Sequence, residues 1–133
     1  MKTINLEILT PYAKYFSGEV EYIEVLSEKY RLGIYPEHTR LITTVVVSHI
    51  LLKINGEIIK YATSGGVMYI KENNEVTLLL ESIEKSDEID LERAIKAKER
   101  AEQRLNHIDD TIDVTRAQAA LSRALNRINI FEK

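Results

Sequence analysis

Residues 50–61 read Ile-Leu-Leu-Lys-Ile-Asn-Gly-Glu-Ile-Ile-Lys-Tyr, and this stretch decides the class of the fold. Two short apolar runs, rich in β-branched side chains, flank the pair Asn55-Gly56. An Asn-Gly pair between such runs predicts a β-hairpin, because both residues tolerate the positive φ angles of a two-residue turn. The segment therefore predicts two antiparallel strands.

Strand patterns continue on both sides of this hairpin. Residues 4–8 alternate between apolar and polar side chains, and residues 67–70 and 76–80 flank a polar turn, which predicts a second hairpin. Between Val20 and Val25 the alternation changes phase, which predicts a β-bulge. Short strands at this spacing, with no helical pattern among them, predict a β-sandwich or a flattened barrel.

After residue 85 the apolar period becomes helical. A first helix is predicted from one apolar face, capped by Asp87 or Asp90, and the face consists of Leu91, Ala94, Ala101, Leu105 and Ile108. A polar break at residues 106–110 precedes a second helix, expected from near Thr111 to about Ile130. The short connection predicts antiparallel helices with facing alanines. The fold class is thus a β-sandwich domain, residues 1–85, followed by a two-helix hairpin, residues 86–133.

The second helix has an unusual charge pattern. From Val114 to Phe131 there is no Asp, Glu or Lys, but arginine occurs at Arg116, Arg123 and Arg127. These three form a column beside an apolar stripe with 3-4 spacing, made of Val114, Ala117, Leu121, Ala124, Ile128 and Phe131. A like-charge pair four residues apart costs an isolated helix roughly 0.2–0.5 kcal/mol. The column therefore indicates that acids lie opposite it or that it binds an anion.

Two interpretations of this column remain open from spacing alone. Guanidiniums that converge with Arg93 and Arg100 would suit phosphate oxygens, at roughly 1.5–3 kcal/mol for each charge-assisted hydrogen bond. A carboxylate such as Asp90 or Glu84 would then accept a hydrogen bond from the amine of a purine. The alternative is ion pairing with the acids of the first helix, Glu92, Glu99 and Glu102.

The hairpin itself is expected to be weakly held. Alanine contacts bury little apolar area, and two isolated helices of this length are marginally stable in water. The helical segment is therefore a candidate moving part. The acids between the helices, Asp109, Asp110 and Asp113, lack the spacing of a calcium loop and are expected in the turn and at the helix start.

Composition excludes several classes of function. The 133 residues contain no cysteine, so disulfides and thiolate chemistry are excluded, and the three scattered histidines do not form a zinc motif. A net charge of −3 argues against general binding to nucleic acid. We expect neither a membrane span nor a signal peptide, because no apolar run approaches the roughly 20 residues that cross a bilayer. With no nucleophile–base pair, catalysis by this chain alone is not expected.

Four stretches, in this order and spacing, carry a resemblance to a known family. They are Leu6–Pro11, Leu32–His38, Ser64-Gly65-Gly66 and Glu88–Ala94, the last followed by an arginine-rich run that ends at Arg127. Together with the length, they make essentially the whole chain resemble the epsilon subunits of bacterial F-type ATP synthases. By itself, Gly65-Gly66 is typical of a tight turn rather than a phosphate-binding loop.

The resemblance implies a fold and a function. It implies a ten-stranded sandwich that binds the gamma subunit and the membrane ring of c subunits in the central stalk, which couples proton or sodium flow to ATP synthesis. It implies a hairpin that either folds onto the sandwich or extends towards the catalytic alpha/beta head, where it obstructs ATP hydrolysis. The subunit would be non-catalytic and peripheral, on the cytoplasmic face of the bacterial membrane.

In some members of the family, the folded hairpin binds ATP through an Ile/Leu-Asp-x-x-Arg-Ala motif. The residues that match this motif are Ile89, Asp90, Arg93 and Ala94. The arginines that fall where phosphate-facing arginines would be are Arg100, Arg123 and Arg127. Glu84 falls where an acid near the adenine would be. The resemblance thus implies ATP as a regulatory ligand and no required cofactor.

Three positions depart from the family pattern. Glu37 stands where glycine is usual, residues 27–31 lack the glycines typical there, and Tyr69 stands where an acid is common. Two other functions remain alternatives to the ATP synthase subunit. One is a stand-alone nucleotide-sensing domain, and the other is a partner-binding β-domain with a structural hairpin.

Overall fold

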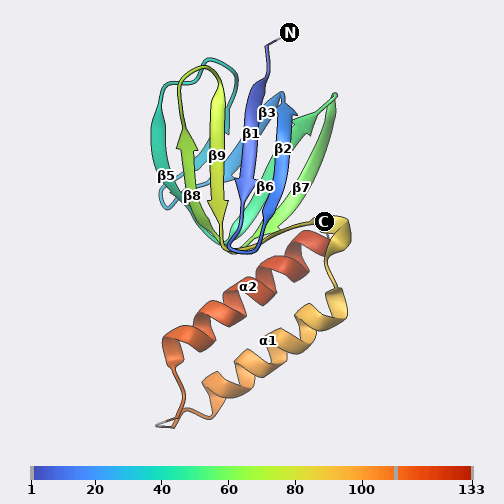
Figure 1. The fold of residues 1–133 in the computed structure, drawn as a ribbon. Helices are drawn as coiled ribbons and strands as arrows, with labels where there is room; N and C mark the ends of the chain where they lie inside the picture. Colours follow the sequence, from blue (N-terminus) through green and yellow to red (C-terminus); the bar gives the residue numbers. More distant parts are fainter. Residues whose placement is uncertain (1, 110, 133) are drawn as a thin grey trace. The chain divides into compact units, whose positions relative to one another are not determined.

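The computed structural model describes residues 2–109 and 111–132, and the chain divides into two compact units (Figure 1). Residues 1–85 form the sandwich unit, with ten strands in two five-stranded sheets. Residues 86–133 form the helical unit, in which the described part holds a 3-10 turn, η1 (Ser86–Glu88), and two helices. The predicted fold class, a ten-stranded sandwich followed by a helical hairpin, is confirmed.

The first sheet has the strand order β2-β1-β9-β8-β5. Its strands are β1 (Ile4–Leu9), β2 (Lys14–Val20), β5 (Leu41–Val45), β8 (Gly66–Ile70) and β9 (Glu75–Leu80). The second sheet has the order β10-β7-β6-β3-β4. Its strands are β3 (Tyr22–Leu26), β4 (Arg31–Ile34), β6 (Ser48–Ile54), β7 (Glu57–Thr63) and β10 (Ile83–Lys85). Every pairing is antiparallel except that of β1 with β9.

Alternate side chains of both sheets form one hydrophobic core. Ile4, Leu6 and Ile8 point inward from β1, and the intervening side chains are less buried. Tyr61 is among the largest fully buried side chains, and its ring meets that of Tyr15 edge-on with 6.2 Å between centroids. Period-2 burial of this kind fixes the register, because a one-residue slip would turn the apolar set outward.

The predicted bulge between Val20 and Val25 is wrong. Val20 ends β2 in the first sheet and Tyr22 begins β3 in the second, so that only Glu21 separates the two strands. The chain changes sheet here, and Val20 and Ile23 both lie in the core, contributed by opposite sheets. The alternation shifts phase because facing sheets present opposite surfaces to the same core. A register shift in the first sheet lies instead between Ile8 and Leu9.

Both predicted hairpins are confirmed. Asn55 and Gly56 connect β6 to β7 with φ angles of 51° and 81°. The amide of Gly56 donates a hydrogen bond of 2.8 Å to Glu21 Oε1. Asn73 and Asn74 turn β8 into β9 with φ angles of 60° and 59°. Asparagine and glycine meet this requirement at the lowest steric cost.

Gly65 and Gly66 carry the chain from β7 in the second sheet to β8 in the first. Gly65 has a φ angle of 103°, as the predicted tight turn requires. At Gly66 the constraint is space, because a Cβ atom there would lie 1.9 Å from the carbonyl oxygen of Leu79. The two strands therefore approach more closely than any larger residue permits.

The substitution Gly66→Ala is expected to destabilise the sandwich by about 3 kcal/mol or more, since the backbone of β9 must shift to admit the methyl group. Chemical denaturation of the purified chain measures this loss. Gly18→Ala in β2 is the matched control, because its Cβ would meet only the Phe16 ring, at 3.4 Å. The control should change stability by less than about 1 kcal/mol. Equal losses in both variants would contradict the close-approach argument.

Glu37, one of the departures from the family pattern, keeps the backbone conformation of a glycine. Its φ angle is 70°. Its amide donates to Asn74 Oδ1 at 2.6 Å, and its carboxylate lies 2.7 Å from Lys2 Nζ. Hydrogen bonding to Lys2 lowers the pKa of Glu37 below its usual value. The loop thus keeps its left-handed turn and is held by local polar contacts.

Replacing Glu37 by glycine and by alanine separates these two effects. Both variants lose the exposed ion pair with Lys2, but only alanine keeps the left-handed strain. We expect Glu37→Gly to be more stable than Glu37→Ala by about 1 kcal/mol, measured by thermal or urea unfolding. An alanine variant as stable as the glycine variant would exclude backbone strain at this position.

The glycine-free segment at residues 27–31 forms a turn through a serine side chain. Ser27 Oγ accepts hydrogen bonds from the amides of Lys29 and Tyr30, at 3.3 and 3.2 Å, and donates to the Tyr30 carbonyl at 2.8 Å. The hydrogen bonds of the Ser27 hydroxyl stabilise the turn, so that no glycine is needed there.

The helical unit contains α1 (Leu91–Asn106) and α2 (Val114–Glu132). The second helix begins at Val114, three residues after the predicted start, because Asp113 acts as its N-cap and accepts from the Arg116 amide at 3.0 Å. Asp109 lies in the turn, as predicted, whereas Asp110 lies outside the described residues. At the other end of α2, Ile130 is buried and Phe131 is 43% exposed, so the predicted stripe is wrong at its last position. Ile130 lies about 120° around the helix axis from Ala124, so the end of α2 is buried through a different face from the one that carries the alanines.

Candidate functional site

Four buried alanines form the seam between α1 and α2. Ala94 and Ala101 lie on α1, Ala117 and Ala124 lie on α2, and none is more than 4% exposed. The helices run antiparallel (Figure 1), and the two alanines of each helix are seven residues, or about two turns, apart, so that they lie on one face of that helix. All four alanines of the predicted contact are therefore buried, as close packing of the helices requires. Small side chains bring the backbones close and leave longer side chains to line the flanks of the seam.

The matched motif lies at the start of α1. Asp90 is the N-cap, since its Oδ1 atom accepts from the Arg93 amide at 3.0 Å. Ile89 and Ala94 are buried, at 5% and 4% exposure, and so pack within the fold. Asp90 Oδ2 makes no hydrogen bond to the described residues, which leaves one carboxylate oxygen able to accept from a ligand.

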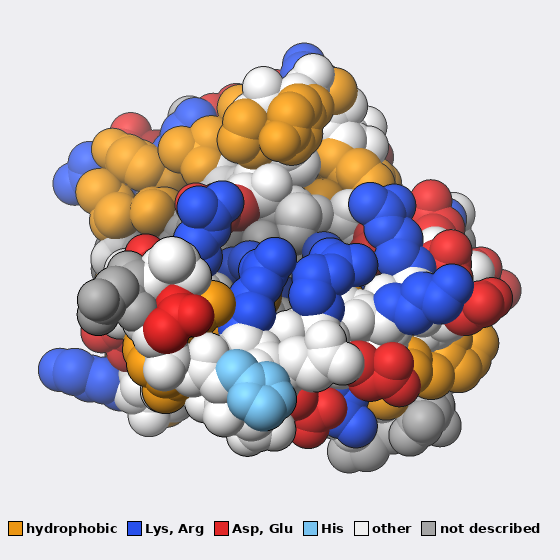
Figure 2. Space-filling model, turned by 90° about the horizontal axis from the view of Figure 1, so that it is seen from below, with side chains coloured by type: hydrophobic (Ala, Val, Ile, Leu, Met, Phe, Trp, Pro, Cys, Tyr) orange, Lys and Arg blue, Asp and Glu red, His pale blue; other side chains and the backbone are white. Residues whose placement is uncertain are grey.

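The predicted arginines lie on both helices. Arg93 and Arg100 are exposed on α1, whereas Arg123 and Arg127 are half-buried on α2. Because the helices are antiparallel, Arg93 at the start of α1 lies nearer the end of α2 than its start. Arg100 lies about two turns further towards the loop. Figure 2 shows Lys and Arg side chains gathered in one area of the face that it views.

Ion pairing with the glutamates of α1 does not account for Arg93, Arg100 and Arg123. Within residues 2–109 and 111–132, no ion pair involves Arg93, Arg100 or Arg123. Glu92, one of the proposed partners, pairs instead with Lys96 four residues away, at 3.4 Å. Three guanidiniums of the helical unit are therefore available to an anion.

Glu84 belongs to the other unit. It lies in β10, half-buried, opposite Ala62 of β7. The other seven predicted site residues belong to the helical unit. The structure thus places the motif of α1 and the arginines of α2 in one unit, and it assigns Glu84 to the sandwich unit.

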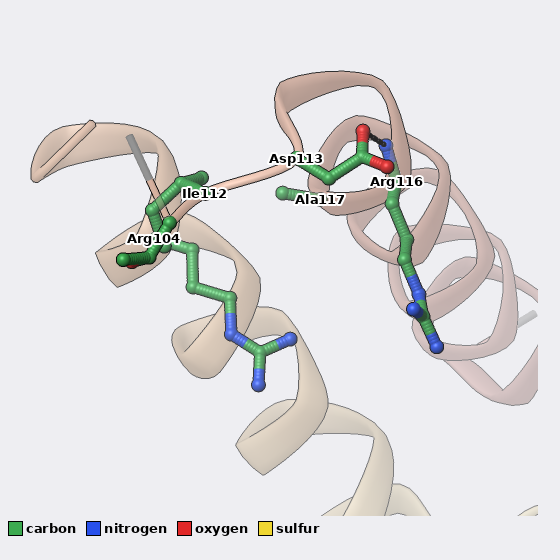
Figure 3. Close-up of a pocket in the computed structure, with 6 residues that line it drawn as sticks. Arg104, Ile112, Asp113, Arg116 and Ala117 are labelled. Atoms are coloured by element: carbon green, nitrogen blue, oxygen red, sulfur yellow. Dashed lines mark hydrogen bonds between the residues drawn. The ribbon is translucent and has the colours of Figure 1, made fainter. Parts of the chain in front are cut away.

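A second group of cations lies at the loop end of the hairpin, where Arg104, which no sequence pattern indicated, joins Arg116 of the predicted column. A recess of about 370 Å³ there is lined by Arg104, Thr111, Ile112, Asp113, Arg116 and Ala117 (Figure 3). Arg104 occupies the last turn of α1 and Arg116 the first turn of α2. A short connection between antiparallel helices brings such residues together, so the loop length was the signal that could have found them.

The outer face of the first sheet carries exposed apolar side chains. Ile42 of β5 is 61% exposed and lies opposite Tyr69 of β8, which is 42% exposed. Leu79 of β9, at 47% exposure, lies opposite Val67. Lys71 Nζ lies 5.8 Å from the centre of the Tyr69 ring. An exposed apolar group of this kind is typical of an interaction surface.

A second recess adjoins this surface at Leu79. It has a volume of about 340 Å³ and is lined by Leu9, Thr10, Pro11, Leu79, Leu80 and Glu81.

In the part of the chain that the structure describes, no group of three or more acidic or histidine side chains could hold a metal ion. Neither described helix combines the length and apolar character that crossing a bilayer requires.

Two family models match nearly the whole chain. The beta-sandwich domain of the ATP synthase delta/epsilon chain matches residues 3–86, and its long alpha-helix domain matches residues 87–132. The chain belongs to this family. Its relatives include the ATP synthase epsilon chain of Desulforamulus reducens, which is 43% identical over 131 residues and 98% of each chain. The epsilon chain of Bacillus pumilus is 38% identical over 133 residues, the full length of both chains.

Solved structures share the fold. A chain of the Euglena gracilis mitochondrial ATP synthase, in an OSCP/F1/c-ring assembly, aligns with a TM-score of 0.80 and 18% identity. The alignment covers 93% of this chain and 78% of that chain. A chain of the Tetrahymena thermophila central stalk and c-ring aligns at 0.59 and 11% identity, over 98% and 95% of the two chains. The resemblance to bacterial epsilon subunits is confirmed, and with it the expectation of an ATP synthase subunit rather than an enzyme.

Proposed function

We propose that this chain is the central-stalk epsilon subunit of a bacterial F-type ATP synthase, bound to the gamma subunit and to the ring of c subunits. In this role it couples rotation of the ring to ATP synthesis in the catalytic head. The full-length similarity to bacterial epsilon chains carries the proposal. As a peripheral subunit it would lie on the cytoplasmic face of the membrane, without entering the bilayer.

The sandwich unit is the part that would bind the rotor. Ile42, Tyr69 and Leu79 form an exposed apolar surface on the first sheet, and the apolar recess at Leu9 and Pro11 extends it. Burying such side chains against a partner gains about 25 cal/mol per Å² of apolar area. We assign this surface to the gamma subunit.

The helical unit is the part that would regulate hydrolysis. Its two helices meet through alanines, which bury little area, so the packing that holds the pair is weak. Large apolar side chains remain exposed on both helices, namely Ile95, Leu125 and Phe131, and Ile108 is exposed in the connection between them. An extended hairpin would bury these side chains against the alpha/beta head and obstruct ATP hydrolysis.

Removal of residues 87–133 tests the inhibitory role. An ATP synthase reconstituted with the shortened chain should retain the sandwich unit in the complex and hydrolyse ATP faster than the enzyme with the full chain. Steady-state hydrolysis and subunit composition after purification are measured together, and enzyme that lacks the chain altogether is the control. Unchanged hydrolysis in a complex that still contains residues 1–86 would contradict inhibition by the hairpin.

We further propose ATP as a regulatory ligand of the helical unit. The unused Oδ2 atom of Asp90 would accept from the adenine amine, and Arg100, Arg123 and Arg127 would face the phosphates. Arg93 would add a further positive charge on α1. Guanidinium–phosphate contacts are charge-assisted and strong, so a modest number of them holds a nucleotide.

Calorimetric titration of the isolated chain with ATP tests this binding. Arg123→Ala should weaken it by about tenfold or more, because a charge-assisted hydrogen bond contributes roughly 1.5–3 kcal/mol. Arg40→Ala is the matched control, since Arg40 belongs to the sandwich unit and pairs with Glu72 at 3.2 Å. Binding that is equally strong in wild type and Arg123→Ala would refute the assignment. Tight binding by a chain that never co-purifies with a gamma subunit would instead favour the stand-alone nucleotide sensor.

A further inference from the structure

We propose that the recess at the loop end of the hairpin binds a phosphate group between Arg104 and Arg116. This site is separate from the Asp90 and Arg123 region and goes beyond the proposed function. The phosphate group would come either from free inorganic phosphate or from a nucleotide.

The two guanidiniums come from different helices and line the same recess. Arg104 lies in the last turn of α1 and Arg116 in the first turn of α2, on either side of the connecting loop. Figure 3 shows both side chains extending in the same direction from α1 and α2. Two guanidinium forks so arranged match the several oxygens of a tetrahedral anion.

The nearby carboxylates are engaged with the backbone. Asp113 Oδ1 accepts from the Arg116 amide at 3.0 Å (Figure 3). Asp109 Oδ1 accepts from the amide and the hydroxyl of Thr111, at 2.7 and 2.6 Å, and the hydroxyl bond lowers the pKa of Asp109. Among the described residues, neither acid forms an ion pair with Arg104 or Arg116.

The start of α2 adds to the positive potential of the recess. Its first turn contains no acid but does contain Arg116, and a cation is unfavourable at the positive end of a helix. The first amides of a helix also lack intrahelical acceptors. Asp113 is the one described carboxylate that lines the recess, so two guanidiniums outweigh one opposing charge. An anion bound there would relieve the repulsion that the helix start otherwise retains.

The recess has room for such a ligand. Its volume of about 370 Å³ is many times the roughly 30 Å³ that one water molecule occupies in the liquid. Buried Ala117 forms part of its wall, and the other five residues are exposed or half-buried. A hydrated phosphate group therefore fits, with access from solvent.

Nuclear magnetic resonance titration of the full chain tests the proposal. Inorganic phosphate is added at constant ionic strength, chloride serves as the control salt, and the amide shifts of residues 104 and 111–117 are followed. The wild type should give saturable shifts with phosphate and none with chloride. The double variant Arg104→Gln/Arg116→Gln should bind about tenfold or more weakly while its other amide shifts stay native.

A second pair of arginines provides the matched control. Arg123→Gln/Arg127→Gln should leave phosphate binding at the loop unchanged, even if this variant no longer binds ATP. Failure of the proposed ATP site can therefore be told apart from failure of the phosphate site at the loop. Repeating the titration with ATP identifies the source: saturation below the phosphate range indicates a nucleotide, and saturation in the same range indicates a free anion. The proposal is overturned by shifts that persist in Arg104→Gln/Arg116→Gln, by equal shifts with chloride, or by no saturable shift at the loop.

Discussion

Alanines at the seam of α1 and α2 let the two helix backbones approach closely, and this approach governs the chemistry of the helical unit. Ala94, Ala101, Ala117 and Ala124 are buried, and their small side chains allow this approach. Guanidiniums of both helices, Arg104 and Arg116, line the recess at the loop end of the pair. The contact that makes the unit weakly stable is thus the contact that gathers its positive charge.

The sandwich unit depends on a different constraint. Its core is built by strict alternation along strands that cross from one sheet to the other at Glu21 and at Gly65-Gly66. Because the core side chains fix every register, the outward side chains are fixed too. The exposed apolar surface of β5, β8 and β9 is therefore held in a fixed arrangement.

Much of this architecture was predictable from local sequence, and the misses have physical causes. Asn55-Gly56 favours the positive φ angles of a tight turn, and the alanine spacing marks one face of each helix. The β-hairpin and the helix pair could therefore be predicted from these residues alone. The change of sheet at Glu21 was mistaken for a bulge, because alternation alone does not reveal which sheet a strand joins. Likewise, Glu37 adopts a glycine conformation for reasons that lie in its contacts with Asn74 and Lys2, far away in the sequence.

The candidate site was predictable to a similar degree. The motif at Asp90 was visible as a helix cap, and the arginine column was visible as a charge pattern. Arg104 could not be predicted as a site residue, because it belongs to no motif. It joins a site only because the loop brings the start of α2 back beside the end of α1. The assignment of Glu84 to the sandwich unit likewise required coordinates.

The parallel pairing of β1 with β9 has a consequence for synthesis on the ribosome. Residues 5–9 find their partners at residues 75–79, so the first strand made must wait for one of the last strands of its unit. Contacts of such long sequence separation slow folding. In the nascent sandwich, the edge of β1 that pairs with β9 therefore stays unpaired until about residue 80 has emerged. By contrast, α1 and α2 are consecutive in the chain, so each can pack on the other as soon as both have been made. An N-terminal strand exposed for this long is where chaperone capture or mispairing would begin.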